Sequence, residues 1–407
     1  MACCRALPDM TLPLIYNWRN LFVRKSSTLL TFGVVALIVV VLVWALSFAQ
    51  GLRDSLQSGG GADTLIIIKP GSTGESTSFL SLQEQQQLSQ LTGVAKSKKG
   101  EPLCSGEILT QTNLVRRGDP LKQTSMIAVR GVSELAFEVH DAIRIVEGRR
   151  FEFGANEVIV GKSILDRVEG VQVGSDIVMG FRGGRAFRVV GVFEASGGPL
   201  ESEIWCSISP VRDMFNRSSM VSSVAAKLER ADLAQGLIDL VRDPPYALQA
   251  KTEAQYYRDI AERSAQLLYM TLILVAFMAF GACFAVANTI YASVDGRAKE
   301  IAMLRTIGYS PASIVWSFLL EAGLICGTAC VFGAVCLGVA MPSLFFGGQK
   351  EDFLSDATWS TFAYQVRVTP AILAWSFGAA LMVGFIGAIV PAVRASKLSI
   401  LSALRQA

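Results

Sequence analysis

Four long apolar runs without charged residues stand out from the more polar chain around them. Each run exceeds the roughly 20 residues that a helix needs to cross a bilayer. The runs lie at about Ser26–Gln50, Ser264–Val294, Ala322–Gln349 and Thr369–Val393, and the third span begins nearer Ala312. The pattern therefore predicts an α-helical membrane protein with four transmembrane helices, at residues 28–50, 263–292, 312–342 and 371–393.

The long polar stretch between the first two spans, residues 51–262, mixes strand and helix patterns. The best strands are rich in β-branched residues: Leu65–Lys69, Asn156–Val160, Asp176–Phe181 and Ala186–Glu194, with a hairpin turn at Arg182–Arg185. Helices are expected at Ser81–Thr92, Pro210–Arg217 and Asp232–Val241. Gly51–Gln57 continues the first span, and Thr252–Ser264 runs into the second, so both are expected to form stalk helices. We therefore predict a large α/β extracytoplasmic domain inserted between helices 1 and 2.

The distribution of lysine and arginine predicts the orientation. The chain is 51% hydrophobic and only 17% charged, which is a low charge content for a soluble protein. Residues 1–27, the loop at 293–311 and the tail at 394–407 are basic, whereas the loop at 343–370 is more acidic. Because positively charged loops stay in the cytoplasm, we expect both termini there and the large domain outside. This topology accounts for the net charge of +3 without a nucleic-acid partner.

The segment before the first span has the pattern of an amphipathic helix in the membrane interface. Apolar residues recur at helical spacing around Trp18, with Arg19, Arg24 and Lys25 between them. The alternative is an ordinary basic flank that only sets the topology. The first span lacks a convincing cleavage site, so we expect it to stay as an anchor.

The loop between the second and third spans carries a short charged helix. Its charged residues are Asp295, Arg297, Lys299, Glu300 and Arg305. Gly308 suits a helix C-cap, and Ser310–Pro311 suits the start of the next helix. An apolar arc of roughly 160° remains, with no obvious cover in the chain: Ile301, Met303, Leu304 and Ile307. This arc predicts a partner protein, although a solvated connecting loop is the alternative.

Glu321 is the charge expected inside a span. Because an intramembrane carboxylate is costly, it is a functional hypothesis by default. We expect a polar contact with the charged loop or the opening helix. The alternative is a carboxylate that reaches the cytoplasmic interface.

Residues suited to catalysis are sparse. His140 is the single histidine, so a catalytic triad has one choice of base, and we expect it at the surface. Gly161-Lys162-Ser163 lacks the earlier glycine of a phosphate-binding loop. No metal-ligand spacing stands out, and we expect no directly bound cofactor or metal and no catalytic residue. Cys104 and Cys206 fall in the outside domain, and the sequence leaves undecided whether they form a disulfide there.

Several stretches closely resemble the MacB/FtsX-like family of ABC transporter permeases, also called type VII. The resemblance spans nearly the whole chain and is strongest in its three cytoplasmic segments: Asn17–Leu21 with Arg24-Lys25, Arg297–Gly308 with Glu321, and Pro391–Ala395 with Ala403–Arg405. In the outside domain it rests on looser matches at Glu147–Phe151, Asn156–Gly161, Val173–Ser175 and Phe187–Val192.

This resemblance implies a permease subunit of the bacterial inner membrane that has no catalytic activity itself. The charged loop would be a coupling helix for a separate ABC ATPase, which binds ATP and Mg²⁺, with contacts from Arg297, Lys299, Glu300, Ile301, Met303, Leu304, Arg305 and Gly308. A second permease subunit is implied, with a periplasmic adaptor or an outer-membrane component as further candidates. The motion would drive export or extraction of a lipid, lipoprotein, peptide or drug. The alternative is an FtsX-like regulator of an outside hydrolase or sensor.

Overall fold

The structure is a computed structural model of the 407-residue chain. It describes residues 25–57, 60–118, 122, 124–180, 184–215, 217, 219–340, 351–355, 360–364 and 368–397. The chain divides into two units, one formed by residues 1–49, 266–348 and 367–407 and the other by residues 50–265 and 349–366. We describe each unit by itself.

The first unit contains four helices long and apolar enough to span a membrane. The spans are Ser27–Gly51, Leu268–Gly296, Pro311–Cys336 and Pro370–Ser396. They belong to α2 (Lys25–Gln57), α8 (Glu253–Gly296), α10 (Pro311–Val331) with its π-helical continuation η4 (Phe332–Ala340), and α12 (Pro370–Ser396). The short helix α9 (Ala298–Ile307) lies between α8 and α10. The four expected membrane helices are thus confirmed.

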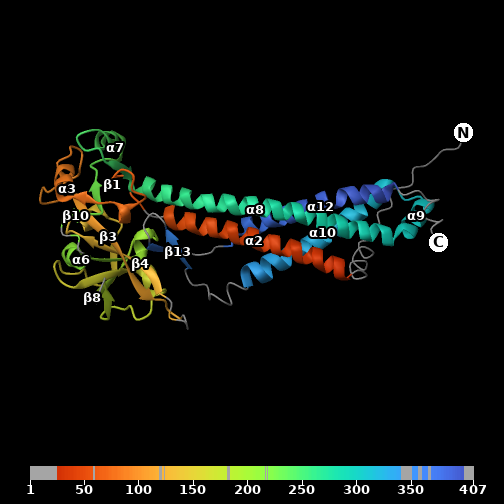
Figure 1. The fold of residues 1–407 in the computed structure, drawn as a ribbon, viewed down its shortest axis with the longest axis horizontal. Coiled ribbons are helices and arrows are strands. Elements are labelled where there is room, and N and C mark those ends of the chain that lie inside the picture. Colours follow the sequence, from red (N-terminus) through yellow and green to blue (C-terminus); the bar gives the residue numbers. More distant parts are fainter. Residues whose placement is uncertain are drawn as a thin grey trace. The chain divides into compact units, whose positions relative to one another are not determined.

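The membrane helices run alongside one another (Figure 1). Small residues let them approach closely. A Cβ atom on Gly387 of α12 would come within 2.6 Å of the Cys283 carbonyl oxygen of α8. The hydroxyl oxygens of Thr31 and Thr289 lie 2.6 Å apart between α2 and α8. Because lipid tails are as apolar as the helices, such close packing and polar contacts are what hold membrane helices together.

The second unit is built on a ten-stranded mixed sheet with the order β12–β1–β11–β3–β4–β9–β6–β8–β5, and β7 pairs with β8. Its strands are β1 (Thr64–Ile68), β3 (Cys104–Val115), β4 (Thr124–Val132), β5 (Arg144–Gly148), β6 (Glu157–Gly161), β7 (Asp176–Met179), β8 (Arg185–Glu194), β9 (Glu203–Ser207), β11 (Ser223–Lys227) and β12 (Gln249–Thr252). Two small ladders join β2 (Leu80–Ser81) to β10 (Met220–Val221), and β13 (Glu351–Ser355) to β14 (Ser360–Tyr364). The β4–β9 and β6–β8 pairs are parallel.

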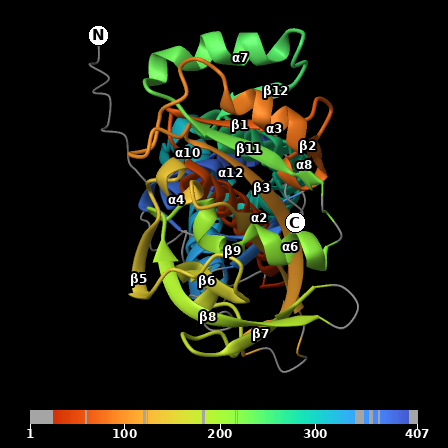
Figure 2. The ribbon, with the colours of Figure 1, turned by 90° about the vertical axis from the view of Figure 1, so that its left-hand side faces the viewer.

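Short helices cover this sheet and close its apolar core. They are η1 (Glu75–Thr77), α3 (Leu82–Ser89), α4 (Ala136–Val139), α5 (Lys162–Leu165), η2 (Pro199–Ser202), α6 (Ile208–Met214), η3 (Ala231–Leu233) and α7 (Ala234–Arg242). Figure 2 shows α3 and α7 near the β12–β1–β11 end of the sheet and α6 beside β9. Leu65, Ile67 and Val224 pack there against Leu237 of α7. The predicted α/β domain between helices 1 and 2 is confirmed.

Local bounds differ slightly from the expected ones. The expected stalk helix begins at Glu253, because Thr252 ends β12, and it joins the second span in one continuous helix, α8. α8 ends at Gly296, beyond the expected residue 292. The expected hairpin pairs β7 with β8, although residues 181–183 of its turn lie outside the described residues. The loop at 343–370 contains the β13–β14 ladder, which the sequence pattern did not indicate.

Candidate functional site

The chain turns sharply between α8 and α10 through α9. Gly308 ends α9 in the left-handed conformation with φ +110°, where a residue with a side chain would be strained. The Ser310 hydroxyl accepts a hydrogen bond of 3.2 Å from the Ser313 N–H, and Pro311 begins α10. The capping residues expected from the sequence are therefore confirmed at both helix ends.

The apolar arc of α9 is only partly uncovered. Ile301 is buried in the core of the membrane unit, Ala302 beside it is also buried, and Leu304 is half-buried. Met303 and Ile307 are 61% and 64% exposed. The expectation that no part of the chain covers this arc is thus wrong for Ile301, because side chains of α10 and α12 belong to the same buried cluster.

The uncovered part of α9 forms a narrow mixed surface. Lys299 and Glu300 are exposed beside Met303 and Ile307, and at 100° per residue these four lie within about 100° of one another. We call these four residues the α9 strip. On the same helix, the Arg305 guanidinium donates a 2.8 Å hydrogen bond to the Ser396 carbonyl oxygen at the end of α12.

Glu321 contacts the residue that immediately precedes α9. The Arg297 guanidinium donates two hydrogen bonds of 3.0 Å to its carboxylate oxygens, and the Ser293 hydroxyl donates a third of 3.1 Å. Glu321 is only 4% exposed, so other side chains of the protein cover its carboxylate. The expected polar contact with the charged loop is present, and it joins α10 to the α8–α9 turn.

The proposed interfacial helix is not placed. Trp18, Arg19 and Arg24 lie outside the described residues, and Lys25 begins α2 with its side chain also outside them. Their role stays a prediction.

A buried charge network in the second unit escaped the sequence analysis. Arg130 of β4 uses all five of its N–H groups to contact Glu75, Glu107 and Glu203 at 2.7 to 3.3 Å. His140 lies 2.9 Å from Glu107 through its Nε2 atom. All five side chains are buried. The expectation that His140 lies at the surface is wrong. His140 is buried because Glu107 and Glu253, which are distant in the sequence, surround it and compensate its charge.

Charge inside this network is strongly stabilised. Burial disfavours a charged imidazole, but Glu107 and Glu253 outweigh burial and raise the pKa of His140 to about 10. Burial likewise opposes ionisation of Glu107, yet His140 and Arg130 lower its pKa to about 2. Burial raises the pKa of Glu203 despite the nearby Arg130. The network therefore holds two cations among its carboxylates at neutral pH.

One sequence signal could have indicated the network. Glu107 and Arg130 each interrupt an otherwise mostly apolar or neutral strand, β3 and β4. A charge at such a position is buried only when it is paired. The pattern could have indicated that each needs a partner, but it could not identify that partner.

Two other sequence candidates have structural explanations. Cys104 and Cys206 are both free and buried, in different core clusters, so no disulfide joins them here. Gly161 lets β6 approach η2, since a Cβ atom there would come within 2.0 Å of the Glu201 carbonyl oxygen. Lys162 pairs with Glu194. This segment thus packs as part of the sheet and does not form a phosphate-binding loop.

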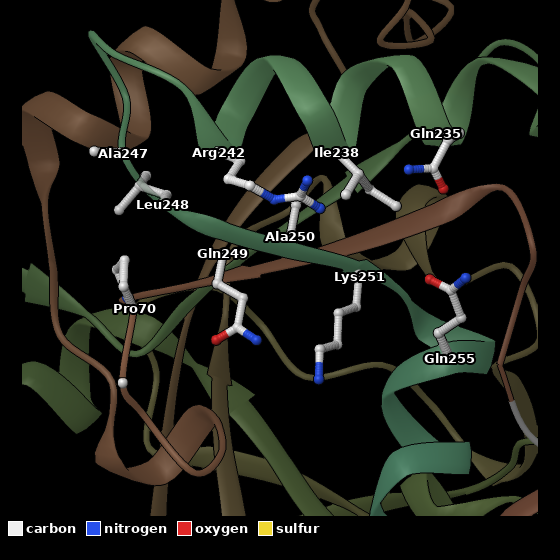
Figure 3. Close-up of a pocket in the computed structure, with 11 residues that line it drawn as sticks. Pro70, Gln235, Ile238, Arg242, Ala247, Leu248, Gln249, Ala250, Lys251 and Gln255 are labelled. Carbon is white, nitrogen blue, oxygen red and sulfur yellow. The ribbon is translucent and has the colours of Figure 1, made fainter.

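A groove of about 580 Å³ lies between α7, β12 and the start of α8. Figure 3 shows its lining, with Gln235, Ile238 and Arg242 on α7, Gln249, Ala250 and Lys251 on β12, and Gln255 on α8. Arg242 pairs with Asp239 at 3.1 Å and Lys251 pairs with Asp259, so nearby carboxylates offset both cations. The rest of the lining mixes three carboxamides with apolar side chains such as Ile238 and Leu248.

Comparisons with known proteins agree with this architecture. The family model of the MacB-like periplasmic core domain matches residues 28–243, and that of the FtsX-like permease C-terminal region matches residues 272–400. The macrolide export ATP-binding/permease proteins MacB of Neisseria meningitidis serogroup B and of Neisseria gonorrhoeae are each 26% identical over 296 residues. These matches cover 68% of this chain but 43% of each relative, so the chain spans less than half of their length.

Two solved extracytoplasmic domains show weak structural likeness. The periplasmic region of MacB from Actinobacillus actinomycetemcomitans has 13% identity and a TM-score of 0.36, covering 51% of this chain and 97% of that one. The extracellular domain of the noncanonic ABC-type transporter YknZ from Gram-positive bacteria has 16% identity and a TM-score of 0.33, covering 46% and 100%. The family models carry the assignment.

Four helices long and apolar enough to span a membrane in the described residues, with an α/β domain between the first two, define a multi-pass membrane protein with a large inserted domain. The chain belongs to the MacB/FtsX-like family of ABC transporter permeases.

Proposed function

We propose that an ABC ATPase binds the α9 strip and that its nucleotide cycle drives a change of shape in the extracytoplasmic domain. In this proposal α9, both termini and the C-terminal tail face the cytoplasm, and a second permease subunit, identical or related, completes the assembly. ATP and Mg²⁺ bind to the ATPase. The observation that carries the proposal is the division of α9 into a strip that is exposed and a face that is anchored.

The anchored face would pass a displacement of the strip into the membrane helices. Ile301 packs in the helix core, Arg305 binds the end of α12, and Arg297 binds Glu321 of α10. A force on Met303 or Ile307 therefore acts on both α10 and α12. These contacts support a coupling role better than they support a solvated connecting loop.

The two long helices give the motion a route outward. α8 is one continuous helix of 44 residues, about 66 Å at 1.5 Å per residue. α2 continues similarly past its span to Gln57. A continuous helix resists bending, so a displacement at one end is transmitted along its length.

Export or extraction of a lipid, lipoprotein, peptide or drug is the favoured outcome of this motion. The matched relatives are named for macrolide export. The second candidate is an FtsX-like regulator that acts on a hydrolase or sensor without moving a substrate, because residues 272–400 match the FtsX-like model. A periplasmic adaptor or outer-membrane component would serve the export candidate.

The test is binding of the ATPase encoded beside this gene to the purified chain in nanodiscs. Met303→Asp with Ile307→Asp places two carboxylates on the strip. Each wild-type side chain would bury about 60% of its surface against the ATPase, so the pair contributes roughly 2–4 kcal/mol. We expect binding to weaken by about 30- to 1000-fold.

Val178→Asp is the matched control, because Val178 is 62% exposed in the other unit. It should leave ATPase binding unchanged. If the wild-type chain binds no ATPase, or if the strip variant binds as well as wild type, the coupling proposal is wrong.

A further inference from the structure

The first turn of α8 enters the buried charge network through Glu253. One oxygen of its carboxylate accepts a 2.9 Å hydrogen bond from the Gly61 N–H, and the other lies 3.5 Å from His140 Nδ1. Gly60 has φ +111°, and a Cβ there would lie 3.0 Å from the Ala254 nitrogen. Residues 60–61, which follow α2 in the chain, thus pass directly against the backbone of α8, and Glu253 of α8 binds Gly61.

Two further side chains seat the same turn of α8. The Tyr256 hydroxyl accepts a 3.1 Å hydrogen bond from the Glu75 N–H, and Tyr257 packs against the Tyr256 ring with centroids 5.5 Å apart. Both rings are buried. Residues at positions i, i+3 and i+4 share one helix face, so Glu253, Tyr256 and Tyr257 form a single docking face.

The contact between His140 and Glu253 is the weakest ionic link in the network. The main contacts of Arg130 and the His140–Glu107 contact measure 2.7 to 2.9 Å, whereas His140 Nδ1 and Glu253 Oε1 are 3.5 Å apart. In the part of the chain that the structure describes, these two buried atoms have no hydrogen-bond partner. A buried polar atom without a partner raises the energy of the closed state, so this contact opens before the others.

We propose that the His140–Glu253 pair is a latch that holds the start of α8, together with the segment arriving from α2, on the central sheet. Opening the latch leaves the sheet side intact, because His140 keeps Glu107 and Arg130 keeps its three carboxylates. The departing Glu253 carboxylate gains water. Residues 60–61 and the start of α8 therefore detach or seat together, at one point, without unfolding the domain.

Hydrogen exchange of the full chain in nanodiscs, without ATPase or nucleotide, tests the latch. Glu253→Gln keeps an oxygen that can accept from the Gly61 N–H but removes the charge that attracts His140. We expect amides of residues 60–63 and 254–262 to exchange roughly tenfold faster, because the hydrogen bond from the Gly61 N–H then goes to a neutral acceptor and His140 loses a nearby opposite charge. Amides of β3, β4 and β9 should keep their wild-type rates.

Asp259→Asn is the control on the same helix, because it removes the partly exposed pair with Lys251 and should not change exchange at residues 60–63. Tyr256→Phe is the second test variant: it removes the acceptor for the Glu75 N–H and should loosen residues 254–262 while leaving the strands protected.

Three results would overturn the latch. The first is unchanged exchange in both segments of the Glu253→Gln variant. The second is an equal rise across β3, β4 and β9, which would make the pair an ordinary part of the core. The third is a variant that does not fold, since the sheet-side contacts must survive without Glu253.

That the latch passes helix motion into the domain rests on the proposed function. The two ideas fail separately, because the exchange experiment contains no ATPase. A chain that binds no ATPase but shows the expected exchange keeps its latch and loses only the coupling role.

Discussion

Breaking the ion pair between Arg297 and Glu321 should strongly destabilise the membrane unit. The pair is nearly inaccessible to water and is joined by two hydrogen bonds of 3.0 Å. Arg297→Met removes the guanidinium and leaves a buried carboxylate with only the Ser293 hydroxyl as partner. Removing one member of a buried ion pair costs about 3–5 kcal/mol. The exposed pair of Lys69 with Glu84 is a suitable reference, worth at most about 1 kcal/mol.

The double variant Arg297→Met with Glu321→Leu separates the pair's own contribution from the penalty of an orphaned charge. Replacing both members of a buried pair with apolar residues is often nearly neutral. We therefore expect the double variant to be more stable than either single variant, Arg297→Met or Glu321→Leu. This non-additivity is the signature of direct coupling.

The assay heats the full chain in nanodiscs with a thiol reagent and measures, by mass spectrometry, the temperature at which Cys326 becomes labelled. Cys326 is buried in the core of this unit, so its labelling reports unfolding of the membrane helices alone. The reasoning is refuted if Arg297→Met leaves this temperature at its wild-type value. It is equally refuted if the two single effects simply add in the double variant.

Three further predictions concern packing, titration and redox chemistry. Gly387→Ala should destabilise the membrane unit by about 1–3 kcal/mol, because its Cβ would collide with the α8 backbone, whereas Gly378→Ala has open space and should be neutral in the same labelling assay. The pKa of His140 is raised from 6.5 to about 10 in the folded protein, so the stability that its charge contributes is complete below pH 6.5 and is lost as the pH rises through 10. The thermal midpoint of the extracytoplasmic domain, measured by circular dichroism, should therefore fall between pH 6.5 and pH 10. His140→Gln should remove this part of the fall. Cys104 and Cys206 are free, so a reducing agent should leave that midpoint unchanged, and a drop would show a bond between them.

Features encoded by neighbouring residues could be predicted from the sequence. The four spans follow from uninterrupted apolar runs. The ends of α9 and α10 follow from Gly308 and Ser310–Pro311, whose backbone preferences act locally. The ion pair of Arg297 with Glu321 was accessible in outline for a related reason. A carboxylate within a span needs a partner, and the basic loop lies only 24 residues away along the chain.

The charge network could not be predicted in the same way. Glu75 and Arg130 are 55 residues apart, and Glu203 is 73 residues from Arg130. The strand order β3–β4–β9 brings Glu107, Arg130 and Glu203 together, and that order includes a parallel pair that no turn signal indicates, whereas Glu75 reaches them from η1. The sequence around His140 likewise does not indicate that Glu107 and Glu253 surround it.

The prediction that the apolar arc of α9 is uncovered was wrong for a different physical reason. Helical periodicity identifies which residues share a side, but it does not show how much of that side the neighbouring helices cover. Ile301 and Met303 belong to the same predicted arc, yet one is buried and the other is exposed. The boundary between them depends on the positions of α10 and α12, which local sequence does not contain.

Both ends of α8 are fixed by buried carboxylates, and this arrangement has a mechanical consequence. Its first residue, Glu253, faces His140, and the residue after its last, Arg297, binds Glu321. Apolar packing between helices tolerates small sliding and rotation, whereas a paired charge loses several kcal/mol when its partner is withdrawn. Each end of α8 therefore has a defined register within its own unit, while the exposed apolar side chains of its middle, such as Phe277 and Phe280, impose none. Between these ends α8 also contacts α2 through Thr289 and α12 through the backbone of Cys283, so a displacement along α8 reaches those two helices as well, which is the property that the proposed coupling function requires of α8.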